Sequence, residues 1–377
     1  MRQARSPRSA SPSCSRLLAV ALAALALALL SGCFRPKTLR PAVDPLKVQE
    51  EVRKQKEYIV RQFLEKQRRV RNVAWPLLKA NAPLCANTSL SIGALLESIH
   101  DVSPALRHGY AEILGMGERI TVTDVPDNTP AQKAGLLPGD VILGLGDEAL
   151  PEGKDARRHI NVLAKKHMKA NGTLTMRIER SGVPMDVTMV AERICNYPVF
   201  LVEKSVVNAY ATGNYIVVYT GLLPILADDN ELALIIGHEL AHNTCGHIKS
   251  TTLNAWTGYL IGGLLTALTG ADMTEEMGTR GVLAYTQEFE FESDYVGIYY
   301  TARAGYDITY VSDTWRKLSV GAPSTITSGS THPAHAERYV ALEAAVKEIH
   351  AKQAAGKTLQ PEFKGQSSSR SSSQAKQ

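Results

Sequence analysis

The most constraining feature of the sequence is a His-Glu-Leu-Ala-His segment at residues 238–242, inside a predicted helix. The helix is expected to begin at residues 228–231, Asp-Asp-Asn-Glu, which offer capping side chains and acidic charge where the helix dipole favours it. Two histidines four residues apart project from one helix face, so both imidazoles can reach one tetrahedral Zn²⁺ ion. Glu239 lies roughly 100° around the helix from His238, where it can act on a water molecule without binding the metal.

A catalytic zinc site usually takes three protein ligands, so a further ligand is expected elsewhere. His247 follows the second histidine by five residues, which does not fit the metzincin spacing, and we expect it at the helix end or behind a ligand. Glu290 and Asp294 share one face of a second predicted helix, where one could bind zinc and the other could hydrogen-bond a ligating imidazole. Glu288 and Glu292 lie on other faces and are expected to be solvated. Periodicity alone leaves the choice between Glu290 and Asp294 open.

Three motifs together resemble one family of zinc endopeptidases. They are the His-Glu-x-x-His helix, the Glu-x-x-x-Asp helix about 50 residues later, and Thr-His-Pro at residues 331–333 before a final helix. The family, of the gluzincin type, includes the CAAX prenyl proteases, the HtpX heat-shock protease and periplasmic quality-control lipoproteins. The resemblance runs from about Tyr197 to Ile349, and one departure is Ser293, where the family commonly has alanine.

This resemblance implies one Zn²⁺ ion per chain and assigns the main site residues. His238, His242 and Glu290 would bind the zinc. Glu239 would be the catalytic base, and Asp294 would support a ligating histidine.

Two further residues are implied at the cleft by the same resemblance. Arg338 matches an arginine about one turn into the final helix. His332 would lie at the zinc, either as a fourth ligand that keeps the enzyme latent or as a catalytic donor to the oxyanion. The Ser- and Thr-rich residues 324–330 give the preceding backbone freedom to move between these roles.

Residues 105–192 read as short strands separated by Gly- and Pro-containing turns. The stretch at 134–140, Ala-Gly-Leu-Leu-Pro-Gly-Asp, resembles the PDZ domain of bacterial proteases, which binds extended peptides at a sheet edge. Residues 91–94 and 114–117 are both candidates for the loop that binds a peptide carboxylate. The motif residues are Gly135, Leu136, Gly139 and Asp140.

The N-terminus resembles a bacterial lipoprotein signal. A basic segment precedes a 14-residue apolar run from Leu17 to Leu30, which is too short for an ordinary membrane span, and Ser-Gly-Cys follows. Cys33 would be lipidated, and Phe34 after it favours the outer membrane over the inner. The alternatives are a cleaved signal with an incidental cysteine and an uncleaved anchor. The chain is therefore expected in the bacterial cell envelope, held to the membrane on its periplasmic side.

The net charge bears on whether the protein binds nucleic acid, and the cysteines bear on whether it forms a disulfide. The net charge of +5 falls to +1 once the four arginines of the signal are removed, which gives no support for nucleic-acid binding. Cys85, Cys195 and Cys245 remain, in a compartment where a pair can form a disulfide. A Cys85–Cys195 bond would close one compact segment, but three pairings are possible and the sequence does not decide among them.

The predicted fold class is α+β, with a PDZ-like β domain followed by a mainly α-helical zincin metalloprotease domain that contains a small β-hairpin. The apolar, Gly-rich residues 256–270 are expected to form a buried helix, with a mobile lid or a membrane contact as alternatives. The expected segments are a lipoprotein signal peptide (1–32), a tether and amphipathic helical segment (33–104), a PDZ-like domain (105–195), a zinc metallopeptidase domain (196–350) and a disordered tail (351–377).

The function expected from these features is zinc-dependent proteolysis of envelope proteins in quality control, with protein or peptide substrates and a peptide ligand for the PDZ domain. The alternative is a non-catalytic, chaperone-like envelope factor that binds peptides and has a structural zinc site. The intact Glu239 argues against this alternative, because loss of the base is the simplest route to an inactive protease.

Overall fold

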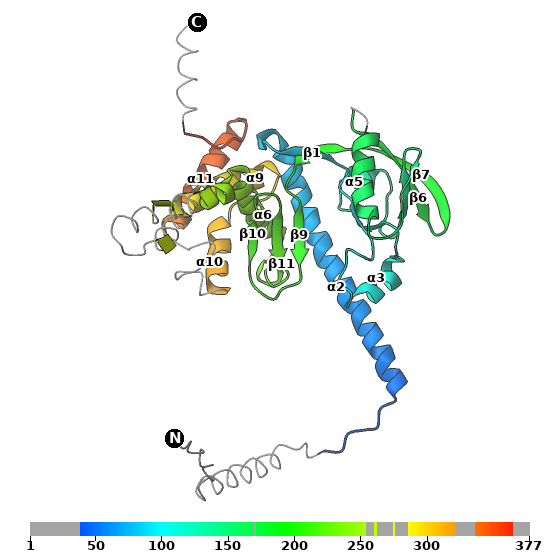
Figure 1. The fold of residues 1–377 in the computed structure, drawn as a ribbon. Helices are drawn as coiled ribbons and strands as arrows, with labels where there is room; N and C mark the ends of the chain where they lie inside the picture. The colour runs from blue at the N-terminus through cyan, green and yellow to red at the C-terminus, as the bar shows by residue number, and fades with distance from the viewer. Residues whose placement is uncertain are drawn as a thin grey trace, which may run out of the picture. The chain divides into compact units, whose positions relative to one another are not determined.

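The computed structural model describes residues 38–168, 171–253, 260–261, 274–275, 286–321 and 336–364 (Figure 1). Cys33, His332 and most of the apolar stretch 256–270 lie outside these residues. The chain divides into two compact units, residues 1–52 and 53–377, and the fold described here is that of the second. None of the described helices combines the length and the apolar character that crossing a membrane requires.

The long helix α2 (Pro45–Ala80) is the amphipathic helix expected in this region. Val70, Val73 and Leu77 recur at helical spacing, are at most 1% exposed, and belong to the core of the C-terminal domain, which follows residue 195. Arg71, on a different face of the same helix, donates to Asp124 Oδ2 and to the Gly93 carbonyl oxygen, both at 2.8 Å. Helix α2 thus contributes to the core of the C-terminal domain and also contacts the β domain, which follows α2 in the chain.

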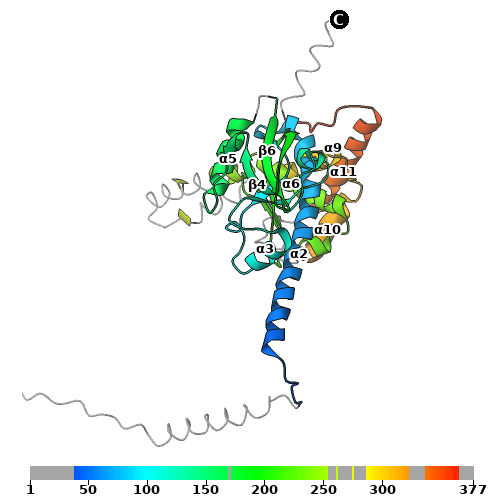
Figure 2. The ribbon, with the colours of Figure 1, turned by 90° about the vertical axis from the view of Figure 1, so that its right-hand side faces the viewer.

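The β domain is built on one antiparallel sheet with β2 at its edge, in the order β2-β3-β4-β6-β7 with β5 paired to β4. Helix α5 packs against β4 and β6 and covers a core of aliphatic side chains (Figure 2). The sheet begins at Leu95, ten residues before the expected domain start at 105. Its elements are β2 (Leu95–Glu97), α3 (Arg107–Leu114), β3 (Thr121–Asp124), α4 (Pro130–Lys133), β4 (Val141–Leu145), β5 (Glu148–Ala149), α5 (Ala156–His167), β6 (Thr173–Arg180) and β7 (Val183–Val190).

The four motif residues of this domain all have structural roles. Gly135 and Gly139 have φ of +80° and +96°, in the left-handed region that favours glycine. Leu136 is buried in the domain core. Asp140 is 1% exposed and accepts two hydrogen bonds from Arg180, at 2.6 and 2.7 Å. The motif therefore closes the turn into β4 and anchors the end of β6.

A two-stranded ribbon and a disulfide join the two ends of the β domain. After the short helix η1 (Ala82–Leu84), β1 (Thr88–Ser91) pairs antiparallel with β8 (Glu192–Cys195). Beside the ribbon, Cys85 and Cys195 form the disulfide that the sequence offered as one of three pairings. Cys245 is a free thiol.

Removing this disulfide is expected to lower the free energy of unfolding by about 2–4 kcal/mol, because the bond restricts the unfolded chain across a sequence separation of 110 residues. Urea unfolding of a Cys85→Ser/Cys195→Ser variant measures the loss, and Cys245→Ser, which leaves the bond intact, is the control. Free alkylation of both thiols in the exported protein would contradict the pairing.

Among the described residues, the C-terminal domain combines a three-stranded sheet with four α-helices. The expected hairpin is present as β10 (Ala209–Ala211) and β11 (Ile216–Tyr219), and β9 (Val199–Val202) adds a third strand parallel to β11. After η2 (Leu223–Ile225) come α6 (Asp229–Thr244), α9 (Thr286–Arg303), α10 (Val311–Gly321) and α11 (Ala336–Ala354).

Helices α6 and α9 approach closely at a pair of glycines. A Cβ added to Gly297 would lie 2.8 Å from the backbone of His238, and one added to Gly237 would lie 2.8 Å from the Gly297 carbonyl oxygen. Both distances are shorter than real Cβ contacts, so the two backbones require glycine at both positions. This contact brings the polar face of α9 against the histidines of α6.

Residues 351–364, which we expected in a disordered tail, are described and make contacts. Helix α11 continues to Ala354, and Arg303 then donates to the Leu359 carbonyl oxygen at 2.7 Å. Lys352 pairs with Glu362 at 2.8 Å. Residues 355–364 therefore pack on the C-terminal domain. The Ser-rich composition that suggested disorder starts only after residue 365.

Candidate active site

Helix α6 carries three of the expected site residues and is buried along nearly its whole length. The Asp228 side chain caps it by accepting from the backbone N–H groups of Asn230 and Glu231 at 2.9 and 3.0 Å. Residues 232–237, which follow the first turn, are all apolar or glycine and are buried, as in a helix at the centre of a core. His238, Glu239 and His242 are 1%, 2% and 7% exposed.

Three buried side chains from α6 and α9 form a triangle of donor groups: two imidazoles and one carboxylate. The Nε2 atoms of His238 and His242 lie 3.1 Å apart, and the Glu290 carboxylate oxygens lie 3.5 Å and 3.3 Å from them, respectively. Tetrahedral ligands about 2.0–2.1 Å from a zinc ion lie about 3.3 Å from one another. These three side chains therefore fit one face of a zinc coordination sphere.

Asp294 and Arg338 lie directly behind this triangle. Asp294 Oδ1 is 3.0 Å from His238 Nδ1, the ring nitrogen that faces away from the other donors. Arg338 donates to both oxygens of Asp294, at 2.6 and 2.8 Å, and its Nη1 lies 3.1 Å from Glu290. Such a carboxylate fixes the tautomer and the ring orientation of a ligating histidine.

The charge balance of the site also fits a divalent cation. Among the described residues the site holds three carboxylates, on Glu239, Glu290 and Asp294, and one guanidinium, on Arg338, and each residue is at most 5% exposed. With neutral imidazoles this leaves two net negative charges in a buried environment, where uncompensated charge is costly. Burial lowers the pKa of His238, but its hydrogen bonds with Asp294 and Glu290 outweigh this effect and raise the pKa to about 10. A cation bound at the triangle would take the place of that proton.

His247 lies behind His242, one of the two positions that we expected for it. Gly246, with φ +75°, turns the chain after α6, and His247 is 3% exposed. Its Nδ1 lies 3.1 Å from His242 Nδ1, and its Nε2 lies 2.8 Å from Glu292 Oε2. Glu292 is exposed, as expected, but it also pairs with the buried His247 imidazole, which the sequence did not indicate.

Exchange of Glu290 for glutamine is expected to weaken zinc binding by more than about 100-fold, because it removes a charged donor from the triangle, whereas loss of an outer partner costs about 10–100-fold. Glu288→Gln is the matched control, since Glu288 is exposed on the same helix. Competition with a zinc-chelating dye measures both. If Glu288→Gln lost more zinc affinity than Glu290→Gln, the third ligand would be Glu288 instead of Glu290.

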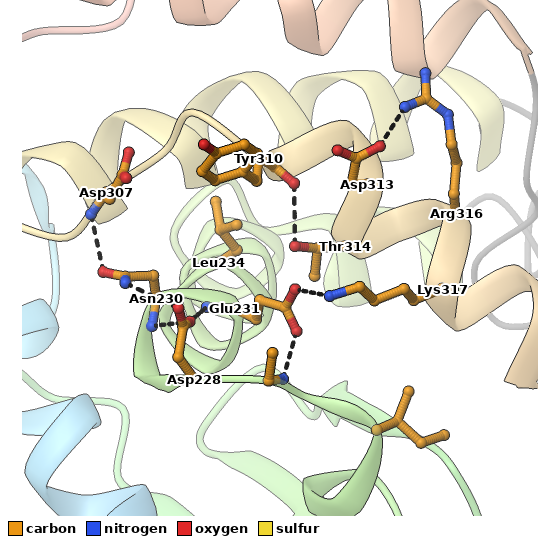
Figure 3. Close-up of a pocket in the computed structure, with 12 residues that line it drawn as sticks. Asp228, Asn230, Glu231, Leu234, Asp307, Tyr310, Asp313, Thr314, Arg316 and Lys317 are labelled. Atoms are coloured by element: carbon orange, nitrogen blue, oxygen red, sulfur yellow. Dashed lines mark hydrogen bonds and ion pairs between the residues drawn. The ribbon is translucent and has the colours of Figure 1, made fainter.

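A cavity of about 900 Å³ lies beside the N-terminal half of α6 and against α10 (Figure 3). Charged side chains at its rim form ion pairs with each other, Glu231 with Lys317 and Asp313 with Arg316. Leu234, one turn before His238, contributes to its apolar lining. Because these charges are already paired, the cavity suits an apolar group better than a charged ligand.

A smaller cleft of about 240 Å³ lies in the β domain between β2 and α5. Ser91, Ile92 and Ala94 line it, whereas residues 114–117 do not. Gly115 instead ends α3 in a left-handed conformation, and Met116 is buried in a separate small cluster. Of the two candidate carboxylate-binding loops, residues 91–94 are the ones at this cleft.

Comparison with known proteins agrees with both parts of this description. Residues 171–346 match the model of peptidase family M48, and residues 91–189 match that of the PDZ domain. The chain is 31% identical over 147 residues to the mitochondrial metalloendopeptidase OMA1 of Arabidopsis thaliana, a match that covers 38% of this chain and 30% of the relative. It is 31% identical over 124 residues to the beta-barrel assembly-enhancing protease of Escherichia coli (strain K12), covering 29% of this chain and 25% of the relative.

A solved structure of the HtrA-type protease AlgW with a decapeptide is similar at 30% sequence identity, over 28% of this chain and 30% of that one, with a TM-score of 0.22. The matched stretches thus span less than a third of the length of each of these relatives. Over the matched residues, the chain is similar to peptidase family M48 and to the PDZ domain.

Proposed function

We propose that this protein is a zinc-dependent endopeptidase of the bacterial cell envelope, anchored by a lipid on Cys33 at the outer membrane. Within its family it would be of the CAAX prenyl protease and HtpX-like type, in a periplasmic lipoprotein form. The observation that carries the proposal is the buried triangle of His238, His242 and Glu290, with Glu239 on the same helix. The E. coli relative named a beta-barrel assembly-enhancing protease supports the envelope location.

The chemistry that zinc supplies when bound is polarisation of the scissile carbonyl and acidification of a water molecule. Glu239 takes the proton from the attacking water and passes it to the leaving nitrogen. Asp294 accepts from the Nδ1–H group of His238 and so leaves Nε2 of that ring available as the atom that would hold the metal. Arg338 holds Asp294 in place through two hydrogen bonds.

Protein substrates would bind as an extended strand along β10. This strand is an edge of its sheet and packs against α6. Asn243, the residue after His242, accepts from the Gly213 backbone N–H at 2.6 Å and donates to the Tyr215 carbonyl oxygen at 3.2 Å. These bonds fix the β10–β11 turn to the zinc-binding helix, so a paired strand would be held in a defined position.

The PDZ domain would bind a peptide in the cleft between β2 and α5. β2 is an edge strand, and its free edge is the surface to which such a domain adds a peptide strand. Residues 91–94 would receive the peptide carboxylate. The partners proposed are therefore protein or peptide substrates, a PDZ-bound peptide and a membrane, without nucleic acid.

Zinc analysis together with casein cleavage tests this function. The purified exported chain is expected to contain one zinc ion, to cleave unfolded casein, to lose this activity with a chelator and to regain it with added zinc. Activity that a chelator leaves unchanged would refute the zinc peptidase. Zinc content without any cleavage would favour the alternative of a peptide-binding envelope factor with a structural metal.

A further inference from the structure

A second group of metal-binding side chains lies next to the zinc triangle. Cys245, His247 and Glu292 each place one donor atom within 4.8 Å of those of the other two. Cys245 belongs to the turn after α6, His247 begins the helical segment that follows this turn, and Glu292 lies on α9. This group shares no residue with the triangle, but His247 touches His242.

The donor set suits a zinc-like cation. A thiol, an imidazole and a carboxylate are all zinc ligands, and their metal bonds measure about 2.0–2.3 Å. His247 is 3% exposed and fixed by a ring stack on Phe289 with centroids 4.5 Å apart. Glu292, with a side chain 45% exposed, can adjust its position and leaves the site open to water for a remaining ligand.

His247 already has a role when only the first site is filled. A His242 bound through Nε2 carries its proton on Nδ1, and His247 Nδ1, at 3.1 Å, accepts it. His247 then carries its own proton on Nε2 and donates to Glu292 at 2.8 Å. The three side chains form a relay that orients the ligand His242.

A cation on His247 Nε2 is incompatible with this relay. The ion takes the Nε2 position, and the ring proton then resides on Nδ1, where Ser293 Oγ at 3.0 Å can accept it. Two N–H donors would then face each other between His247 and His242, and the zinc ligand would lose its acceptor. Loss of such an outer partner typically costs about 10–100-fold in metal affinity or activity.

We propose that Cys245, His247 and Glu292 form a second, inhibitory site for a zinc-like divalent cation. Filling it withdraws the hydrogen-bond acceptor from His242 and slows the peptidase. The existence of the site is independent of the proposed function, whereas its inhibitory effect rests on it.

Cobalt binding tests the site without reference to activity. Co²⁺ added to the zinc-loaded, disulfide-bonded protein should give a near-ultraviolet sulfur-to-cobalt charge-transfer band that saturates at one equivalent. The triangle has no thiolate ligand, and Cys85 and Cys195 are joined to each other, so Cys245 is the described thiol that can produce the band. Cys245→Ser should lack it. No band in the wild type, or an equal band in Cys245→Ser, would overturn the proposal.

Zinc titration of casein cleavage tests the inhibition. Turnover should reach its maximum at one equivalent of zinc and fall about tenfold or more as a second binds, while Cys245→Ser should stay at its maximum. Equal inhibition of both proteins would refute the regulatory role even where the cobalt band is present. A complete absence of cleavage at one equivalent would refute the proposed peptidase and leave the cobalt result to decide the site.

Discussion

Replacing Glu239 by glutamine is expected to reduce casein turnover about a thousandfold while the protein keeps its zinc. The amide is nearly isosteric with the carboxylate but cannot take a proton from water, and general base catalysis contributes about 10²–10⁴-fold. The zinc should remain, because His238, His242 and Glu290 form the triangle without this residue. Initial rates and zinc content, measured on the same preparation, give both quantities.

Glu288→Gln is the matched control for this result, since it makes the same exchange at an exposed position. Its rate and zinc content should equal those of the wild type. Unchanged turnover in Glu239→Gln would show that the metal only holds helices together. Loss of zinc in that variant would instead place Glu239 among the ligands.

Replacing Arg338 by methionine is expected to lower the free energy of unfolding by about 3–5 kcal/mol. Arg338 is 5% exposed and pairs with Asp294 and Glu290, so its removal leaves buried carboxylates without their countercharge. Methionine keeps most of the side-chain volume, which limits the contribution of a cavity. Denaturant unfolding at a fixed zinc concentration measures the loss.

Arg316→Met is the control that separates the effect of burial on stability from the effect of losing an ion pair. Arg316 also pairs with two carboxylates, those of Asp313 and Glu343, but all three side chains are 53–58% exposed. Surface pairs of this kind contribute about 0–1 kcal/mol. Equal losses in the two variants would mean that the buried network around Asp294 adds no stability of its own.

The outline of the zinc triangle was predictable because it depends on helix periodicity. Residues four apart share a face in any helix, so His238 with His242, and Glu290 with Asp294, were paired from the sequence alone. Which carboxylate faces both imidazoles depends on how α9 is placed against α6. That placement comes from the contact of Gly237 with Gly297, which no local pattern reveals.

The relay through His247 was only half predictable for a related reason. Its position behind a ligand was one of two expectations, but Glu292 was assigned to solvent because it lies on a different helix face from Glu290. The left-handed Gly246 reverses the chain and brings His247 to that other face. A glycine two residues after the end of a helix is a weak signal, and its φ cannot be inferred from spacing.

The parallel strand β9 was not anticipated either. A hairpin can be recognised from two strands that are close in sequence and joined by a turn. Strand β9 instead pairs directly with β11, although β10 lies between them in the sequence. Long-range pairing of this kind leaves little trace in local sequence. The α+β class and the order of the two domains were nevertheless correct, because each has its own motif.

The glycine contact between α6 and α9 has a consequence for which ion the protein accepts. Gly297 rests on the backbone of His238, so the separation of the two ligand-bearing helices is fixed by main-chain atoms that cannot be compressed. If His238, His242 and Glu290 bind a metal as proposed, the radius of the preferred cation would depend on the spacing of the two helices as much as on the identity of the ligands. A lineage that drifted toward a larger metal would retain its histidines and glutamate and change the small residues between the helices.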